Sequence, residues 1–133
     1  MPYSTAWEPG GVIWTFWGVV SGEEILRSNQ EIYGDARFDE LKYQIVDLTR
    51  VERFDATRDD MAMIASNDIA AARSNPRVRV AVAARDELIR ELSVFYETAS
   101  AGSPWRQRIF DSVREARSWV TRPPGSASGR GAE

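Results

Sequence analysis

The chain has 133 residues, with 17 basic and 20 acidic side chains and a formal net charge of −3 at neutral pH. It contains no histidine and no cysteine, which excludes disulfides, zinc sites, cysteine nucleophiles and histidine general bases. The mildly acidic balance, with no basic stripe along the chain, also argues against a nucleic-acid partner.

The first two predicted elements form an N-terminal hairpin. Residues 3–7 read as a short strand, Pro9-Gly10-Gly11 as a turn, and the apolar run from Val12 to Val20 as a second strand. This run is too short to cross a bilayer, because a spanning helix needs roughly 20 residues. We therefore expect no membrane span and a cytoplasmic location.

The second strand is apolar on both faces, which is typical of a strand inside a sheet. Trp14 and Trp17 fall on opposite faces because side chains alternate along a strand. At least one of them is therefore expected in the core. The other is either core as well, or part of an exposed apolar patch that binds a partner or a second copy of the chain.

The rest of the chain alternates between helices and strands. Helices are predicted where a capping residue precedes apolar residues three or four apart, and strands where β-branched residues run together. In chain order these are a helix from Ser21 to Gly34, a strand from Tyr43 to Leu48, a helix from Thr57 to Arg73, a strand from Val78 to Ala84, a helix capped by Asp86, a strand from Arg106 to Phe110 and a helix capped by Asp111. The third helix is expected to bury Leu88, Leu92, Phe95, Tyr96 and Ala99.

This order predicts an α/β fold with a mixed, mostly parallel sheet of about five strands, an N-terminal β-hairpin and about four helices. Residues 1–121 are expected to form one domain. Residues 122–133 are rich in Pro, Gly, Ser and Ala, which predicts a disordered C-terminal tail. Trp119, near the end of the last helix, is expected to be structural.

Three segments resemble the SpoIIAA-like family, which shares the STAS fold of anti-sigma-factor antagonists. They are Phe16-Trp17-Gly18-Val19-Val20-Ser21-Gly22-Glu23-Glu24, Tyr43-Gln44-Ile45-Val46-Asp47-Leu48-Thr49, and Arg108-Ile109-Phe110-Asp111 followed by Glu115-Ala116-Arg117-Ser118-Trp119-Val120. The resemblance implies a non-catalytic regulatory or protein-interaction domain. The alternative that it leaves open is a carrier or sensor of a small apolar or amphipathic ligand, held in a cavity between helices and sheet.

The antagonists carry an Asp-Ser-Ser-Gly loop in which a kinase phosphorylates a serine. Here the loop falls on Asp55-Ala56-Thr57-Arg58, so Thr57 is the position that could accept a phosphate. We favour a different role for Thr57, as the N-cap of the following helix, because Thr at that place accepts a hydrogen bond from the first helical turn.

Three polar residues are candidates for a ligand site. Asp47 ends a predicted strand, where open α/β sheets bind ligands, although an Asp there also caps the following turn. Asp68 falls within the apolar stripe of its helix, and Asn29 holds the equivalent place in the first helix. Asn29 and Asp68 either face a cavity as converging polar groups or are satisfied by partners in the core.

The remaining charged groups have simpler interpretations. The acid pairs Glu23-Glu24 and Asp59-Asp60 complement helix dipoles, so no metal site is predicted there. Arg77 and Arg79 are expected to be solvated. No catalytic motif is present, and we expect no enzyme activity, no cofactor and no metal, with a homodimer or another protein as partner.

Overall fold

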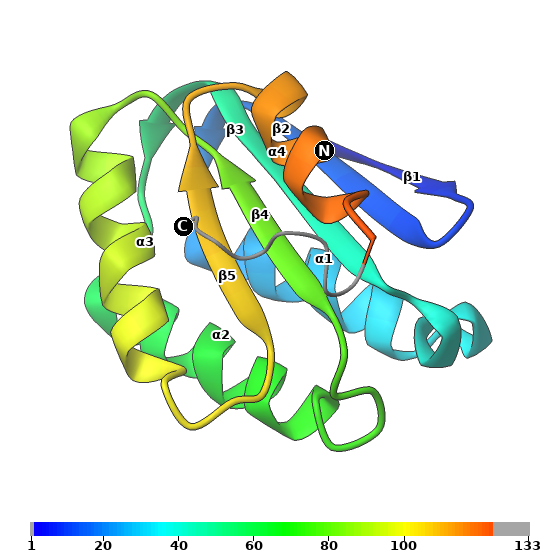
Figure 1. Ribbon diagram of the computed structural model, residues 1–133. Helices are drawn as coiled ribbons and strands as arrows, with labels where there is room; N and C mark the ends of the chain where they lie inside the picture. The colour runs from blue at the N-terminus through cyan, green and yellow to red at the C-terminus, as the bar shows by residue number, and fades with distance from the viewer. Residues whose placement is uncertain (1, 124–133) are drawn as a thin grey trace.

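The computed structural model describes residues 2–123. Five strands form one sheet in the order β1-β2-β3-β4-β5 (Figure 1). The strands are β1 (Tyr3–Glu8), β2 (Gly11–Val20), β3 (Tyr43–Phe54), β4 (Arg79–Ala83) and β5 (Arg106–Phe110). The helices are α1 (Gly22–Tyr33), α2 (Arg58–Ala71), α3 (Glu87–Ala99) and α4 (Val113–Val120), with a short 3-10 helix, η1 (Ala36–Glu40).

The two faces of the sheet are covered unequally. Helices α1, α2 and α3 bury their apolar residues against one face and build the main core. The short helix α4 lies on the opposite face, against β3, β4 and β5 (Figure 1). Strand β1 pairs antiparallel with β2, and the other neighbours are parallel. The predicted α/β fold, with its mostly parallel sheet and N-terminal hairpin, is confirmed.

The alternation along β2 decides the roles of its tryptophans. Trp14 lies on the helix-covered face and is 1% exposed, together with Phe16. Trp17 points to the opposite face and is 42% exposed. The prediction that at least one tryptophan is core is confirmed. Trp17 lies on the α4 side of the sheet, where α4 covers β3, β4 and β5 and leaves this part of β2 exposed.

Strand β3 is longer than predicted. The sequence suggested an end at Leu48, whereas the strand continues to Phe54. Two register irregularities against β2, one of them beside Gly18 with its φ of 69°, let the polar-rich stretch after Leu48 stay paired with the end of β2. Charged residues such as Arg50 and Arg53 favoured a loop in the sequence analysis. The stretch is a strand because its backbone pairs with β2, and backbone pairing cannot be detected from the hydropathy of side chains.

Two capping boxes fix the starts of α1 and α2. Ser21 and Glu24 cap α1 reciprocally, and Thr57 and Asp60 do the same for α2. The two helix starts are close together, since a Cβ at Gly22 would lie 2.6 Å from the Asp60 side chain. Glycine at this position therefore permits the close approach.

Smaller predictions were wrong in identifiable ways. Leu88 is 57% exposed and Ala99 is exposed, while Ile89 is buried. The inward face of α3 follows Ile89, Leu92, Ser93 and Tyr96, three or four residues apart, and leaves Leu88 and Ala99 outside it. The cap of α4 is Ser112, whose hydroxyl accepts from the Glu115 amide, not Asp111. Helix η1, which buries Phe38, was not predicted.

The predicted tail lies almost entirely outside the described residues, which end at Pro123. Among the described helices, none has both the length and the apolar composition needed to cross a bilayer.

Candidate functional site

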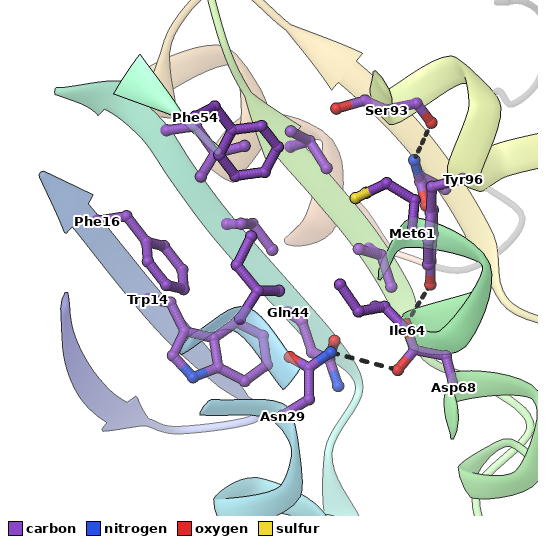
Figure 2. Close-up of a pocket in the computed structure, with 16 residues that line it drawn as sticks. Trp14, Phe16, Asn29, Gln44, Phe54, Met61, Ile64, Asp68, Ser93 and Tyr96 are labelled. Carbon is purple, nitrogen blue, oxygen red and sulfur yellow. Dashed lines mark hydrogen bonds between the residues drawn. The ribbon is translucent and has the colours of Figure 1, made fainter. Parts of the chain in front are cut away.

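A cavity of about 60 Å³ lies between the helix-covered face of the sheet and helices α1, α2 and α3. Figure 2 shows its walls, with aromatic and aliphatic side chains from the strands on one side and helix residues on the other. Its apolar lining includes Trp14 and Phe16 from β2, Phe54 from the end of β3, and Met61 and Ile64 from α2.

Asp68 is the centre of the polar part of this cavity. It is 5% exposed, and its carboxylate accepts hydrogen bonds from the hydroxyls of Tyr33 in α1 and Tyr96 in α3. Asn29 Nδ2 lies 3.4 Å from Asp68 Oδ1, a longer contact (Figure 2). Three helices thus converge on one buried carboxylate. Its partners satisfy it, as a buried charge requires.

Burial raises the pKa of Asp68 to about 6, although the hydrogen bonds from Tyr33 and Tyr96 favour the charged form and act in the opposite direction. The pKa values of both tyrosines are raised by burial and by the negative charge of Asp68. The cluster therefore contains one group that changes charge near neutral pH, and it lies in the wall of a cavity.

Other polar atoms at the cavity wall have no protein partner. The Trp14 indole Nε1 and the Gln107 Oε1 are buried without a hydrogen bond. Gln107 Nε2 lies 3.5 Å from the Ser93 carbonyl oxygen, at the limit of a hydrogen bond. An unsatisfied buried donor or acceptor costs free energy, so a guest that bonds to these atoms would gain from doing so.

Asp47 is not part of this site. Its strand neighbours Gln44 and Val46 line the cavity, whereas Tyr43 and Ile45 pack under α4, so Asp47 faces the α4 side of the sheet. Asp47 Oδ1 accepts from the Thr49 amide at 2.9 Å and from the Thr49 hydroxyl at 2.7 Å. The structure therefore brings Asn29 and Asp68 together and separates Asp47 from both.

The sequence and the fold were compared with those of known proteins. No family sequence model and no curated protein sequence matches the chain. Among solved structures, it is similar to the anti-sigma factor antagonist SpoIIAA in its unphosphorylated form, with a TM-score of 0.58 and 11% identity over 86% of this chain and 93% of that chain. This chain has a SpoIIAA-like fold. A second similar structure is an uncharacterised DUF3478 family protein with a SpoIIAA-like fold from Shewanella loihica PV-4, with a TM-score of 0.52 and 15% identity over 89% of this chain and 91% of that chain.

In this SpoIIAA-like fold Thr57 stands at the start of α2. Its hydroxyl accepts from the Asp60 amide at 3.1 Å, and its own amide donates to the Asp60 carboxylate at 2.9 Å. The hydroxyl is thus engaged in a capping box, the geometry expected of an N-cap. Thr57 itself is exposed.

The SpoIIAA-like chain offers no evident catalytic arrangement in its cavity. Among the described lining residues Asp68 is the one carboxylate, and the one serine, Ser93, donates its hydroxyl to the Ile89 carbonyl and not to a base. Within residues 2–123, no three acidic side chains gather in a way that could hold a metal ion.

Sequence reasoning missed several members of the site. Tyr96 was assigned to the apolar stripe of its helix and Tyr33 was not singled out, and nothing in the sequence indicates that their hydroxyls share an acceptor. Gln44 carried a usable signal, because it is a polar residue on the inward face of an otherwise apolar strand. Gln107 lies in a short strand with charged neighbours, where nothing in the pattern marks it as inward.

Proposed function

We propose that this SpoIIAA-like chain is a non-catalytic regulatory domain that binds a protein partner. The observation that supports this most is a surface on the α4 side of the sheet, made by Trp17, Val19, Arg50 and Arg53 and called here the outer patch. Trp17 is 42% exposed and Val19 is 48% exposed. They pair in register with Arg50 and Arg53 of β3, so the four residues lie side by side.

The outer patch has the composition of an interface centre. Tryptophan and arginine are the residues that most often dominate binding energy at protein interfaces. Large exposed apolar side chains on a rigid sheet also lose little conformational entropy when they bind. A Trp–Val pair on β2, flanked by two arginines of the paired strand β3, is therefore well suited to anchor a partner.

Charge indicates what kind of partner fits. Arg53 is bonded to Asp55, with 2.9 Å between Nε and Oδ1, while Arg50 has no ion pair with any described residue. A second copy of the chain would bring like charges together, which is unfavourable. A partner with acidic residues around an apolar pocket matches better.

The outer patch also adjoins the loop that corresponds to the phosphorylated loop of the antagonists. The Asp55 amide donates to the Val20 carbonyl at 2.8 Å, which ties this loop to the end of β2. A partner seated on Trp17 and Val19 would therefore reach the start of α2. This continuity supports the regulatory interpretation.

The double variant Trp17→Ser/Val19→Thr is expected to lose the partner. The full chain would be used to isolate binding proteins from the source organism, and the purified partner would then be titrated by calorimetry. Truncating a tryptophan anchor weakens binding by on the order of thirtyfold. The matched control is Leu88→Ser/Val94→Thr on α3, where the side chains are 57% and 51% exposed.

The control is expected to bind within about twofold of the wild type, because exposed substitutions away from the interface change little. An equal loss of partner affinity in both double variants, or wild-type affinity in the Trp17→Ser/Val19→Thr chain, would contradict the proposal.

The second candidate function is a carrier or sensor of a small amphipathic ligand, and the cavity at Asn29 and Asp68 supports it. Its size is a constraint: about 60 Å³ is less than half of the roughly 150 Å³ that holds a benzene molecule. A larger apolar guest would have to move α2 or α3 away from the sheet.

Native mass spectrometry of the full chain as purified tests this second function. A bound molecule is expected to appear as added mass, and Val80→Leu, which narrows the cavity without touching Asp68, is expected to reduce it. Bare wild-type protein, or an adduct that Val80→Leu leaves unchanged, would rule the cavity out as a ligand site.

A further inference from the structure

A second concavity, of about 790 Å³, lies at the opposite end of the sheet from the loop at Thr57. It is formed where β3, β4 and β5 begin and where α4 ends. Tyr43, Arg79 and Arg106 are register partners across these three strands, so they stand in a row at one edge of the sheet. A volume of this size is within the roughly 300–1,000 Å³ typical of small-molecule sites.

The lining of this concavity is strongly basic. It contains five cationic residues, which together are called here the basic cleft: Lys42, Arg77, Arg79, Arg106 and Arg122. No acidic residue is among its described lining residues. This is notable in a chain whose acidic side chains outnumber its basic ones by 20 to 17.

The charges in the basic cleft are not neutralised within residues 2–123. None of the five cations forms an ion pair with a described acidic side chain. Arg79 Nη1 donates to the carbonyls of Trp119 at 2.9 Å and Arg122 at 2.8 Å, and Arg77 Nη2 donates to the Asp39 carbonyl at 3.3 Å. These bonds hold two guanidinium groups in place without cancelling their charge.

Arg79 is the member whose environment is most unusual. Burial lowers the pKa of its guanidinium, and the positive charges of Arg106 and Arg122 lower it further. Three like charges held together in a concave, partly desolvated place repel one another. A bound anion would relieve this repulsion.

We propose that the basic cleft binds a small phosphorylated molecule with at least two negative charges, such as a nucleoside diphosphate. Guanidinium groups match the oxygens of a phosphate through paired hydrogen bonds, and a lysine adds a point charge. The rest of the lining is apolar and rich in proline, which suits the non-phosphate part of an organic ligand.

The form of the site favours a small ligand over a nucleic acid or a membrane. The five cations surround one concavity, whereas a polymer or a lipid surface is met by charges spread along a stripe or a flat face. The site is also separate from the outer patch, so the proposal does not depend on the protein partner.

Calorimetric titration of the full chain with ADP, ATP and inorganic pyrophosphate, in low salt, tests the basic cleft. The variant is Arg106→Gln/Arg122→Gln, because neither side chain bonds to a described residue. The control is Arg73→Gln/Arg114→Gln, which removes the same charge from exposed positions outside the cleft. Affinity is expected to fall at least about tenfold in the first variant and to change less than about twofold in the second.

Two further arms separate the possible sources of phosphate. The same proteins are tested with vesicles containing phosphatidylserine and with a single-stranded oligonucleotide. Binding of vesicles or oligonucleotide without binding of any soluble probe would overturn the small-ligand proposal. So would equal losses in the two double variants, or no heat of binding by wild type at millimolar probe.

Discussion

Trp119→Ala is expected to destabilise the protein by about 3 kcal/mol or more, measured as the free energy of unfolding in urea. Trp119 is 7% exposed and packs with Phe110, with 5.7 Å between the ring centroids. It belongs to the small core between α4 and the sheet, which also contains Tyr43, Ile45 and Ala81. Because α4 has only 8 residues, little else there can compensate for a cavity.

Ser118→Ala, on the exposed side of the same helix, is the matched control and is expected to change stability by less than about 0.5 kcal/mol. A loss below about 1 kcal/mol in Trp119→Ala would show that α4 closes over the missing ring. It would also mean that the α4 side of the sheet tolerates repacking, which would weaken the view of this face as a rigid platform for the outer patch.

The parts of the fold that the sequence predicts are those governed by local patterns. The run from Val12 to Val20 and the capping residues Ser21 and Thr57 each act within a few residues, and the structure has an element boundary near each. The end of β3 was missed because strand pairing beyond Leu48 depends on β2, not on the local residues.

The candidate site shows the same division. Asn29 and Asp68 stood out because each is a polar residue where a helix should be apolar, and the structure places them 3.4 Å apart. Their tyrosine partners could not be predicted, since Tyr33 and Tyr96 meet Asp68 only after three helices pack together.

The basic cleft could not be predicted from the sequence, because its residues come together only in the folded sheet. Arg77 and Arg79 were interpreted as solvated, Arg122 was placed in the predicted disordered tail, and no sequence pattern links Lys42 and Arg106 to them. The parallel sheet assembles them, since the amino ends of neighbouring parallel strands meet at one edge.

The stability of the protein is expected to depend on pH through Asp68. Burial raises the pKa of this carboxyl to about 6 in the folded protein, from an ordinary value near 3.8. The folded state therefore holds a proton that the unfolded state has already released between these two values. Stability contributed by the neutral form is complete below about pH 4 and is lost as the pH rises through 6.

The size of this loss of stability follows from the difference between the folded and unfolded pKa values of Asp68. About two pKa units correspond to roughly 3 kcal/mol. Tyr33 and Tyr96 face the carboxylate from α1 and α3, and neither they nor Asn29 changes charge in this range. The described residues of the cavity lining include no other acid and no basic side chain, so the pH-dependent change at this cavity is assigned to Asp68.

Asp68→Asn isolates the effect, because asparagine cannot titrate. The free energy of unfolding would be measured by urea denaturation from pH 4 to pH 7 for wild type, for Asp68→Asn and for Asp59→Asn, an exposed acid of the same helix. The advantage of wild type over Asp68→Asn is expected to shrink by about 3 kcal/mol across this range. Asp59→Asn provides the baseline for removing a carboxylate from α2.

If the difference between wild type and Asp68→Asn stays constant from pH 4 to pH 7, then Asp68 titrates at the same pH in the folded and unfolded protein. The two tyrosine hydrogen bonds would then offset the cost of burying its charge, and the cavity would contain a permanent anion near neutral pH.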